Sequence, residues 1–456
     1  MRIGDCCIQE KGIADVSHAI HRNLNYHPPR AVRGDGPYVI DSNGKRYLDG
    51  CGGAAVSCLG HSHPAVIEAM KRQVERLPYA HTSFFTTGVL EELAETLVGS
   101  APGMGKVLLV SGGSEAIEAA LKLSRQYFVE SGEPQRHLFI ARRQSYHGNT
   151  LGALAVGGNE WRRKNFAPLM VPGNHISPCF EYREKRSDEN RDEYGRRVAD
   201  ELEEKLIELG PQNVAAFVAE TVVGATAGAV AAVPGYFERI RELCDQYGVH
   251  LILDEVMCGT GRTGTMMAYE QEGIVPDLVT MAKGLAAGYQ PVGALLCKRQ
   301  ITDAIEAGSG FFQHGHTFMG HATAVAASLA TQRVIRDENL LQNVTDRGRS
   351  IRKRLREALA DHEHVGDVRG RGLFVGVEFV SDRTSKAPLD PARKIHNQVQ
   401  KAALDEGLMC YGMGGTIDGR RGDHILLAPP YNLREEHETE LVEKFTKATS
   451  AIFRTS

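Results

Sequence analysis

The chain has 456 residues, of which 42% are hydrophobic and 24% are charged, and its formal net charge is −4. This composition is ordinary for a folded globular protein, and the slightly acidic balance gives no electrostatic reason to expect a nucleic acid or an anionic membrane as a partner. No stretch approaches the length of a membrane span, and the first residues lack the basic segment and apolar run of a secretory signal.

Nine cysteines are scattered through the chain without a CxxC pair. This usage is typical of reduced thiols, so we expect a cytoplasmic protein without a disulfide framework. Cys6 and Cys7 are interpreted as two exposed thiols near a frayed terminus rather than as a reactive pair.

The sequence of residues 38–76 predicts a hairpin followed by a helix. Residues 38–49 place Asn43-Gly44 between two apolar runs, which is a strong hairpin signal. Residues 51–60 are rich in small side chains, which suits close approach of backbone to a ligand or partner. After Pro64, residues 65–76 are amphipathic and predict a helix.

From about residue 90 to residue 320, helical and strand patterns alternate. Apolar runs at 107–110, 138–141, 214–219, 250–253 and 278–282 are short and bulky, as in buried strands. Their alternation with helical segments predicts a mainly parallel sheet covered by helices, an α/β fold. The charge-dense segment 182–204 is interpreted as a solvated loop followed by an exposed helix.

The pattern changes after about residue 320. Residues 321–359 predict a long helical stretch with a break near 337–339, and 372–379 and 424–428 predict strands. Helices are expected at 393–406 and 435–453. We therefore expect an N-terminal segment at 1–64, a large domain at 65–320 and a small α+β domain at 321–456, completed by the N-terminal hairpin.

Two neighbouring strands of the predicted sheet end in opposite charges. Asp254 ends one apolar run and Lys283 ends the next. Charged residues are expensive to bury without partners, and ligands of open α/β sheets bind at the carboxyl ends of the strands. Pyridoxal 5′-phosphate (PLP) requires both groups, because its aldehyde forms a Schiff base with a lysine and its ring nitrogen needs an acidic partner. A solvated surface lysine is the common alternative, but the apolar flanks of Lys283 argue against it.

Other residues at strand ends fit the same cofactor. Ser111-Gly112-Gly113-Ser114 lies between a strand and a helix, where amides and hydroxyls bind phosphate, although a tight turn capped by Ser114 would look alike. Tyr146, followed by His147, could stack on a flat ring or be an ordinary core aromatic. Glu220 could be an acid behind the cofactor or a surface residue.

Two rival sites are weaker. Residues 259–264 match GxGxxG, but no acidic residue lies about 20 positions further on, where a dinucleotide ribose would need it. Histidines in the segments 61–63 and 314–321 lack a companion carboxylate or thiolate, so no metal site is expected.

Several motifs in order resemble the class III PLP-dependent aminotransferases, also called the ω-aminotransferase family. The sequences that carry the resemblance are DEVMCGTGRTG (254–264), PDLVTMAKGLAAGYQPVGA (276–294), HGHTFMGHATA (314–324), DSNGKRYLDG (41–50), GHSHP (60–64), SGGSEAIEAALKLSR (111–125), SYHG (145–148), GRGLFVGVEF (370–379) and DHILLAPPYN (423–432). The resemblance covers nearly the whole chain. It implies fold-type I, with a large PLP domain, a small domain from both chain ends, and a homodimer with shared active sites.

The resemblance also implies roles for single residues. Lys283 matches the catalytic Schiff-base lysine and Asp254 the pyridinium partner. The other positions that match cofactor contacts are Val256 and Tyr146 on the two ring faces, His147 beside Tyr146, Gly113 and Ser114 in the phosphate cradle, Glu220 near the ring oxygen, and Thr317, which reaches the phosphate of the neighbouring subunit. Many members have proline after the glutamate, whereas this chain has Thr221.

Substrate contacts are expected from three places. In the amine:pyruvate branch an arginine before the late GDH motif binds the carboxylate of the acceptor, and Arg421 matches it, with Arg420 as the alternative register. A bulky aromatic of some amine transaminases is replaced near Ala54 and Ala55, which implies a roomier pocket or a different donor. Phe84 and Phe85 are candidates for the apolar wall of the pocket, and core packing is an equal alternative.

The expected activity is transfer of an amino group from an amine or ω-amino acid to a keto acid, pyruvate in particular, by a ping-pong cycle. Alternatives within the family are a decarboxylating transaminase, an aminomutase, a racemase, and a 2-oxoglutarate-dependent transaminase of a diamino acid. A non-catalytic PLP-binding protein and a nicotinamide oxidoreductase are the rivals from other classes. Dimers could pair into tetramers.

Overall fold

The computed structural model describes residues 18–454, so the expectation for Cys6 and Cys7 lies outside the described residues. The cysteines within this range are all free and buried. No helix in the same range is long and apolar enough to cross a membrane.

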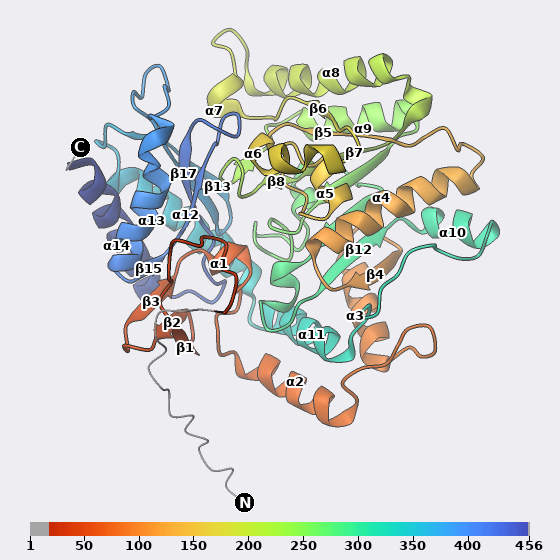
Figure 1. Ribbon diagram of the computed structural model, residues 1–456, viewed down its shortest axis with the longest axis horizontal. Coiled ribbons are helices and arrows are strands. Elements are labelled where there is room, and N and C mark those ends of the chain that lie inside the picture. The colour runs from red at the N-terminus through yellow and green to blue at the C-terminus, as the bar shows by residue number, and fades with distance from the viewer. Residues whose placement is uncertain (1–17, 455–456) are drawn as a thin grey trace, which may run out of the picture.

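A mixed seven-stranded sheet forms the centre of the larger part of the molecule (Figure 1). In spatial order its strands are β4 (Lys106–Val110), β12 (Gly293–Cys297), β11 (Leu278–Met281), β10 (His250–Asp254), β7 (Val214–Glu220), β5 (Leu138–Arg142) and β6 (Asn174–Ile176). Only β12 is antiparallel to its neighbours in this sheet, and the remaining pairings are parallel. This architecture confirms the predicted α/β fold with a mainly parallel sheet.

Strands β7, β10 and β11 are buried along their whole length because helices cover both faces of the sheet. Val218 and Ile252 face one hydrophobic cluster, whereas Phe217 and Leu253 face the other, as the two-residue period of a strand requires. Helices α4 (Gly113–Glu130) and α10 (Arg299–Ala307) cover the first face, and α8 (Arg191–Leu209) and α9 (Tyr236–Tyr247) the second.

The register of the parallel strands brings three polar side chains to one edge of the sheet. Asp254 of β10 is opposite Glu220 of β7 on one side and opposite Thr280 of β11 on the other. Lys283 follows Thr280 after only two residues. The strand ends therefore assemble acidic and basic groups without help from distant loops.

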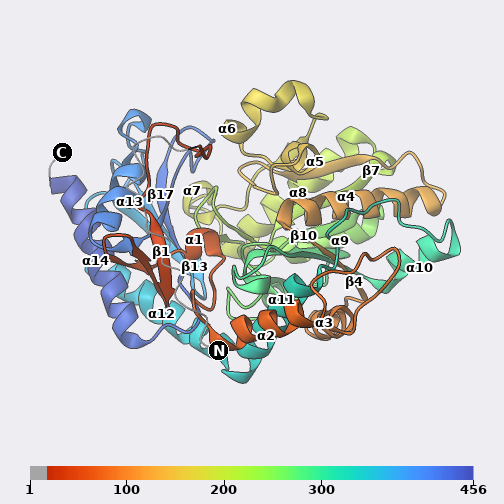
Figure 2. The same cartoon turned by 60° about the horizontal axis from the view of Figure 1, so that its bottom comes forward.

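The second part of the molecule contains a four-stranded antiparallel sheet and three long helices. Its strands, in spatial order, are β13 (Val365–Arg371), β14 (Phe374–Phe379), β17 (Asp423–Leu427) and β16 (Tyr411–Gly414), and its helices are α12 (Leu340–Ala358), α13 (Ile395–Asp405) and α14 (Glu435–Arg454). Figure 2 shows this part beside the main sheet, with α1 (Gly52–Ala55) at the junction.

Strands from the N-terminal and C-terminal parts of the chain pair in a third sheet. It contains β1 (Ala31–Asp35), β2 (Tyr38–Asp41), β3 (Arg46–Asp49) and β15 (Leu408–Met409). The β2–β3 hairpin confirms the prediction from Asn43-Gly44, and Gly44 adopts the positive φ of 81° that the turn needs. Strand β15 pairs with β3 in parallel, which joins the N-terminal hairpin to the C-terminal part. The boundaries at residues 64 and 320 stay a prediction.

The remaining elements connect these layers. The helices are α2 (Pro64–Arg76), α3 (Gly88–Gly99), α5 (Leu151–Val156), α6 (Glu160–Arg163), α7 (Glu181–Glu184) and α11 (Ala322–Asp337), the 3₁₀ turns are η1 (Lys164–Leu169), η2 (Pro211–Asn213), η3 (Ala268–Glu272), η4 (Lys283–Ala286) and η5 (Pro391–Arg393), and a small hairpin contains β8 (Val222–Val223) and β9 (Val230–Ala231).

Three predicted helices can be compared with the structure. The predicted break in 321–359 is confirmed, because α11 ends at Asp337 and Asn339 has a left-handed φ of 51° before α12. Helix α4 begins at Gly113, inside the 111–114 turn that was predicted to precede it, and its N-cap is the extended Gly112 rather than Ser114. The helix predicted after the loop in 182–204 exists as α8, but it is exposed on one face only, because it buries an apolar face that includes Tyr194 and Leu202.

Candidate active site

Lys283 is separated from the end of β11 by Ala282 alone and is the first residue of η4. Its φ of 51° is left-handed, a conformation that costs a non-glycine residue about 1–3 kcal/mol and is concentrated at functional sites. Burial lowers the pKa of its amine to about 8, although Asp254 and Glu220 oppose this shift. Lys283 is therefore a strained, partly desolvated amine with a sizeable neutral fraction near pH 8.

Asp254 is buried, and both of its carboxylate oxygens have partners. Oδ1 accepts a hydrogen bond from the amide of Val256 at 3.0 Å and lies 3.5 Å from the hydroxyl of Thr280. Oδ2 is 2.8 Å from Nδ1 of His147, whose Nε2 is buried without a partner among the described residues. The carboxylate is thus held in one orientation by groups from three separate segments of the chain.

Glu220 is also buried beside this cluster. Its Oε1 accepts the amide of Tyr146 at 3.0 Å and its Oε2 accepts the amide of Gly224 at 2.8 Å. Burial raises the pKa of Glu220. The following Thr221 is buried and donates its hydroxyl to Glu255 at 2.9 Å. The position that follows Glu220 is therefore filled by a hydrogen-bonded side chain.

The N-terminus of α4 forms the third side of the site. Amides in the first turn of a helix have no carbonyl partner within the helix and attract anions, which applies to Gly113 and Ser114. Ser114 Oγ donates to Oδ1 of Asn149 at 3.1 Å and accepts its amide at 3.1 Å. A Cβ on Gly148 would lie 2.6 Å from Ser114 Oγ, so glycine is required for this approach. Asn149 was not predicted, although its place after SYHG could have indicated it.

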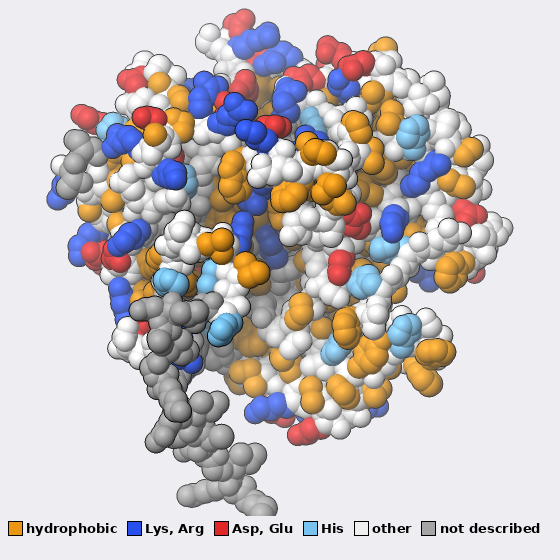
Figure 3. All heavy atoms as spheres, viewed as in Figure 1, with side chains coloured by type: hydrophobic (Ala, Val, Ile, Leu, Met, Phe, Trp, Pro, Cys, Tyr) orange, Lys and Arg blue, Asp and Glu red, His pale blue; other side chains and the backbone are white. Residues whose placement is uncertain are grey.

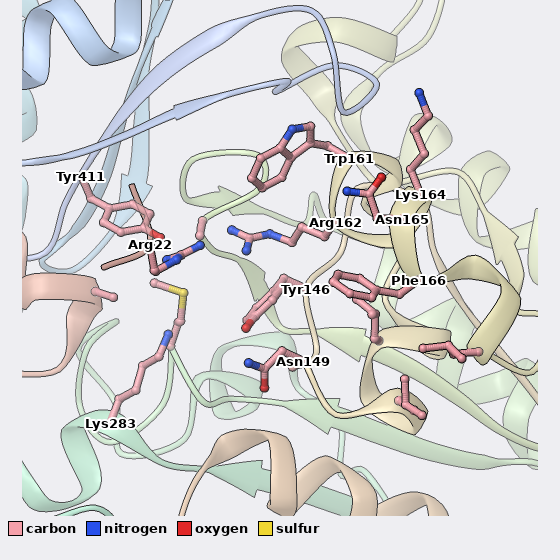
Figure 4. A pocket seen from close by; sticks show the side chains of 17 residues that line it. Arg22, Tyr146, Asn149, Trp161, Arg162, Lys164, Asn165, Phe166, Lys283 and Tyr411 are labelled. Atoms are coloured by element: carbon pink, nitrogen blue, oxygen red, sulfur yellow. The ribbon is translucent and has the colours of Figure 1, made fainter. Parts of the chain in front are cut away.

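These groups surround a recess of about 130 Å³ that opens into a larger cavity of about 1040 Å³. The two share Tyr146, Gly148, Met257 and Lys283 as lining residues. The recess is lined by all the predicted cofactor residues except Thr317, namely Gly113, Ser114, Tyr146, His147, Glu220, Asp254, Val256 and Lys283. Figure 4 shows Lys283 and Tyr146 in the larger cavity, facing Tyr411 and Trp161.

Thr317 is not part of this assembly within a single chain. It is exposed, and its carbonyl accepts a hydrogen bond from the hydroxyl of Tyr79 at 2.8 Å. Its predicted contact with a neighbouring subunit stays a prediction.

The predicted substrate residues also lie outside the cavity lining. Phe84 and Phe85 are 78% and 68% exposed. Ala55 is buried in a hydrophobic cluster, while its neighbour Ala54 lines the cavity. The Nε of Arg421 donates to Asp418 at 2.7 Å on an exposed turn. None of the four predicted substrate residues therefore lines the cavity within a single chain, and their contacts with the substrate stay a prediction.

The cavity wall contains basic residues that the sequence patterns did not single out. They are Arg22, Arg162 and Lys164. The run of three basic residues at 162–164 was a local signal, but nothing in it indicates which of the three faces the cavity.

The two rival sites do not form within the described part of the chain. The glycine-rich loop 259–264 is followed by the 3₁₀ turn η3 rather than by the helix that a dinucleotide site requires. Its buried Arg262 donates to the carbonyls of Leu373 and Pro429, which ties the main sheet to the C-terminal part. Within residues 18–454, no cluster of three potential metal ligands occurs.

The residues present fit PLP. An amine, a buried anchored carboxylate and a helix N-terminus correspond to its aldehyde, ring nitrogen and phosphate. Gly113 leaves space beside the ring site, because a Cβ there would lie 2.9 Å from Cγ1 of Val256.

Comparison with known proteins agrees with this geometry. The family model for class-III aminotransferases matches residues 21–449. An aminotransferase from Gibberella zeae is 44% identical over 435 residues, covering 94% of this chain and 85% of that protein. A taurine–pyruvate aminotransferase from Bilophila wadsworthia is 34% identical over 453 residues, covering 96% and 95%. The PLP-bound amine transaminase from an uncultivated Pseudomonas species superimposes with a TM-score of 0.88 at 34% identity, covering 97% and 99%.

Proposed function

This chain belongs to the class-III aminotransferases, which use PLP, and we propose that it moves the amino group of a primary amine or ω-amino acid to pyruvate. The observation that carries the proposal is the meeting of a strained lysine and an anchored aspartate below a large cavity. The taurine–pyruvate and amine transaminases among its relatives support an amine donor and a pyruvate acceptor.

PLP, when bound, supplies an electron-withdrawing ring that acidifies the substrate carbon beside the nitrogen. Lys283 would attach the cofactor and then, once displaced, move the proton at that carbon through its Nζ. A base works best when its pKa is close to the working pH, and the lowered pKa of Lys283, about 8, meets this condition.

Asp254 would accept a hydrogen bond from the ring nitrogen and keep that nitrogen protonated. His147 holds Oδ2 of Asp254 and so fixes the direction of the carboxylate. Tyr146 and Val256 would enclose the ring, Gly113 and Ser114 would bind the phosphate, and Glu220 would stand near the ring oxygen.

The proposal includes a homodimer in which Thr317 completes the phosphate site of the other subunit. Two segments distant in sequence lie together around Thr317, because Tyr79 bonds its carbonyl and the ring of Tyr79 is 5.9 Å from that of Phe318. The exposed Phe84, Phe85 and Phe318 give this region an apolar surface suited to an interface. Light scattering measures the mass and separates a dimer from a tetramer.

A visible absorption spectrum tests the proposed reaction. The PLP-loaded protein should have a cofactor band that bleaches with an amine donor and returns with pyruvate. A protein that shows no band after incubation with PLP would contradict the proposal. Product analysis separates the alternatives: carbon dioxide indicates a decarboxylating enzyme, an isomer indicates an aminomutase or racemase, and recovery only with 2-oxoglutarate indicates a different acceptor.

A further inference from the structure

The wall of the larger cavity has an unbalanced charge. Its described lining contains four cationic side chains, Arg22, Arg162, Lys164 and Lys283, and no aspartate or glutamate. Basic side chains lie in the hollow near the centre of the face shown in Figure 3. Lys283 is assigned to the cofactor. The other three cations therefore leave a positive potential in the cavity that could attract an anionic ligand.

Arg162 is the best placed of these cations. Its guanidinium lies over the ring of Tyr146, 4.6 Å from the centroid, and points into the cavity (Figure 4). Its Nε is buried without a hydrogen-bond partner, and no ion pair involves Arg162 among the described residues. The backbone is fixed, because Asn159 caps α6 by accepting the amide of Arg162 and bonds Gln144 through its own side chain.

The neighbouring arginines have other partners. Arg163 donates to the carbonyl of Ala155 at 3.3 Å and lines different clefts. Arg421 is paired with Asp418, and its side chain is 58% exposed. Among these three arginines, only Arg162 combines an unpaired, partly desolvated guanidinium with a place in the same cavity as Lys283.

An unpaired charge that has lost part of its hydration is unfavourable, and an anion restores the lost interactions. A guanidinium binds a planar or tetrahedral oxyanion through two parallel hydrogen bonds, which gives both energy and orientation. Arg22 and Lys164 would strengthen the potential that attracts such a group.

We propose that Arg162 binds a terminal carboxylate or sulfonate of the amino donor, so that the enzyme prefers anionic ω-amino compounds to neutral amines. This inference rests on the proposed function and assigns the anion to Arg162 instead of Arg421. The stacked Tyr146 orients the guanidinium within the cavity that both residues share with Lys283.

The test compares Arg162→Gln with Arg163→Gln as a matched control, and with Arg421→Gln. The donors are 3-aminopropanoate, 2-aminoethanesulfonate and the neutral propylamine, each with pyruvate and the PLP-loaded protein. We expect Arg162→Gln to lower kcat/KM for the anionic donors by about 10- to 100-fold, the scale of a hydrogen bond to a charged group. Propylamine turnover should stay within about threefold, and Arg162→Lys should recover part of the loss. The preferred anion identifies the carboxylate or the sulfonate as the better ligand.

The inference fails if Arg421→Gln shows this selective loss and Arg162→Gln does not, or if Arg162→Gln affects propylamine equally. An unchanged cofactor spectrum shows that each variant is folded. Calorimetric binding of propanoate, an unreactive anion, tests Arg162 without turnover. If no donor reacts but propanoate binding depends on Arg162, the proposed function fails and the anion site stands. If propylamine reacts with pyruvate but propanoate does not bind and the two anionic donors are not preferred, the proposed function stands and the anion site fails.

Discussion

The floor and the wall of the cavity are built differently. The floor consists of Asp254 and Glu220, which the strand register positions at one edge of the central sheet, and of Lys283 and His147 in the segments that follow β11 and β5. The wall consists of Arg22, Trp161, Arg162, Lys164 and Phe166, and most of it comes from α6 and η1, which are short and largely exposed.

The polar groups differ in the same way. In the floor, both carboxylates are buried and each of their oxygens has a partner. In the wall, Arg162 has no anion to pair with among the described residues and Trp161 is 66% exposed. Preorganised groups suit a reaction common to all substrates, whereas unpaired groups on short segments suit recognition of one substrate. The residues of the floor should therefore determine the rate of the chemical step, and the residues of the wall should determine which donors are preferred.

The strongest test of this division is Lys283→Ala. Loss of the amine removes both cofactor attachment and proton transfer, so we expect turnover to fall by about 10²–10⁴-fold or more for every donor. Steady-state assays with charged and neutral donors measure this. Lys298→Ala, which removes a lysine paired with Asp277 away from the cavity, should keep its turnover. A loss of turnover confined to anionic donors would show that Lys283 acts in donor recognition and not in the chemical step.

Asp254→Asn should have the next largest effect. The amide cannot hold the ring nitrogen protonated, so we expect kcat for all donors to fall by about 10²–10³-fold, the scale of losing one preorganised electrostatic group. The rate of cofactor bleaching by an amine measures the loss. A reduction smaller than tenfold would show that the carboxylate positions His147 rather than the cofactor.

The pH dependence of cofactor attachment should report the pKa of Lys283. A lysine with a pKa lowered to about 8 is mostly protonated at pH 7 and mostly neutral at pH 9, and only the neutral amine attacks an aldehyde. The rate at which cofactor-free protein captures PLP should rise about tenfold between these pH values. Stopped-flow absorbance gives the profile. A midpoint near the ordinary lysine value would show that the floor does not desolvate the amine.

The smallest effect is expected in the wall, for Trp161→Ala. An aromatic contact contributes about 0.5–1.5 kcal/mol, so we expect kcat/KM for bulky donors to fall by about 2- to 10-fold. Bleaching of the cofactor band by small amines should continue. Assays with an aryl amine and with propylamine separate the two. An equal loss of kcat/KM for both donors would mean that Trp161 acts on the chemical step and not on donor selectivity.

Much of the floor could be predicted because its residues end strands. Asp254, Glu220 and Lys283 each follow an apolar run, and the carboxyl ends of parallel strands meet at one edge. The wall could not be predicted in this way, since Arg22, Arg162 and Tyr411 approach one another only through the packing of three distant segments (Figure 4).

Local sequence was sufficient to predict the α/β fold, the hairpin at Asn43-Gly44, the break before α12 and the residues at the strand ends, because each depends on periodicity or turn chemistry. The packing of the folded chain was needed to establish that β12 runs antiparallel, that Thr221 bonds Glu255, and that Arg421 pairs with Asp418 while Arg162 has no ion-pair partner among the described residues. Those outcomes depend on contacts between residues far apart in the chain or on the direction of a side chain, which local spacing does not encode.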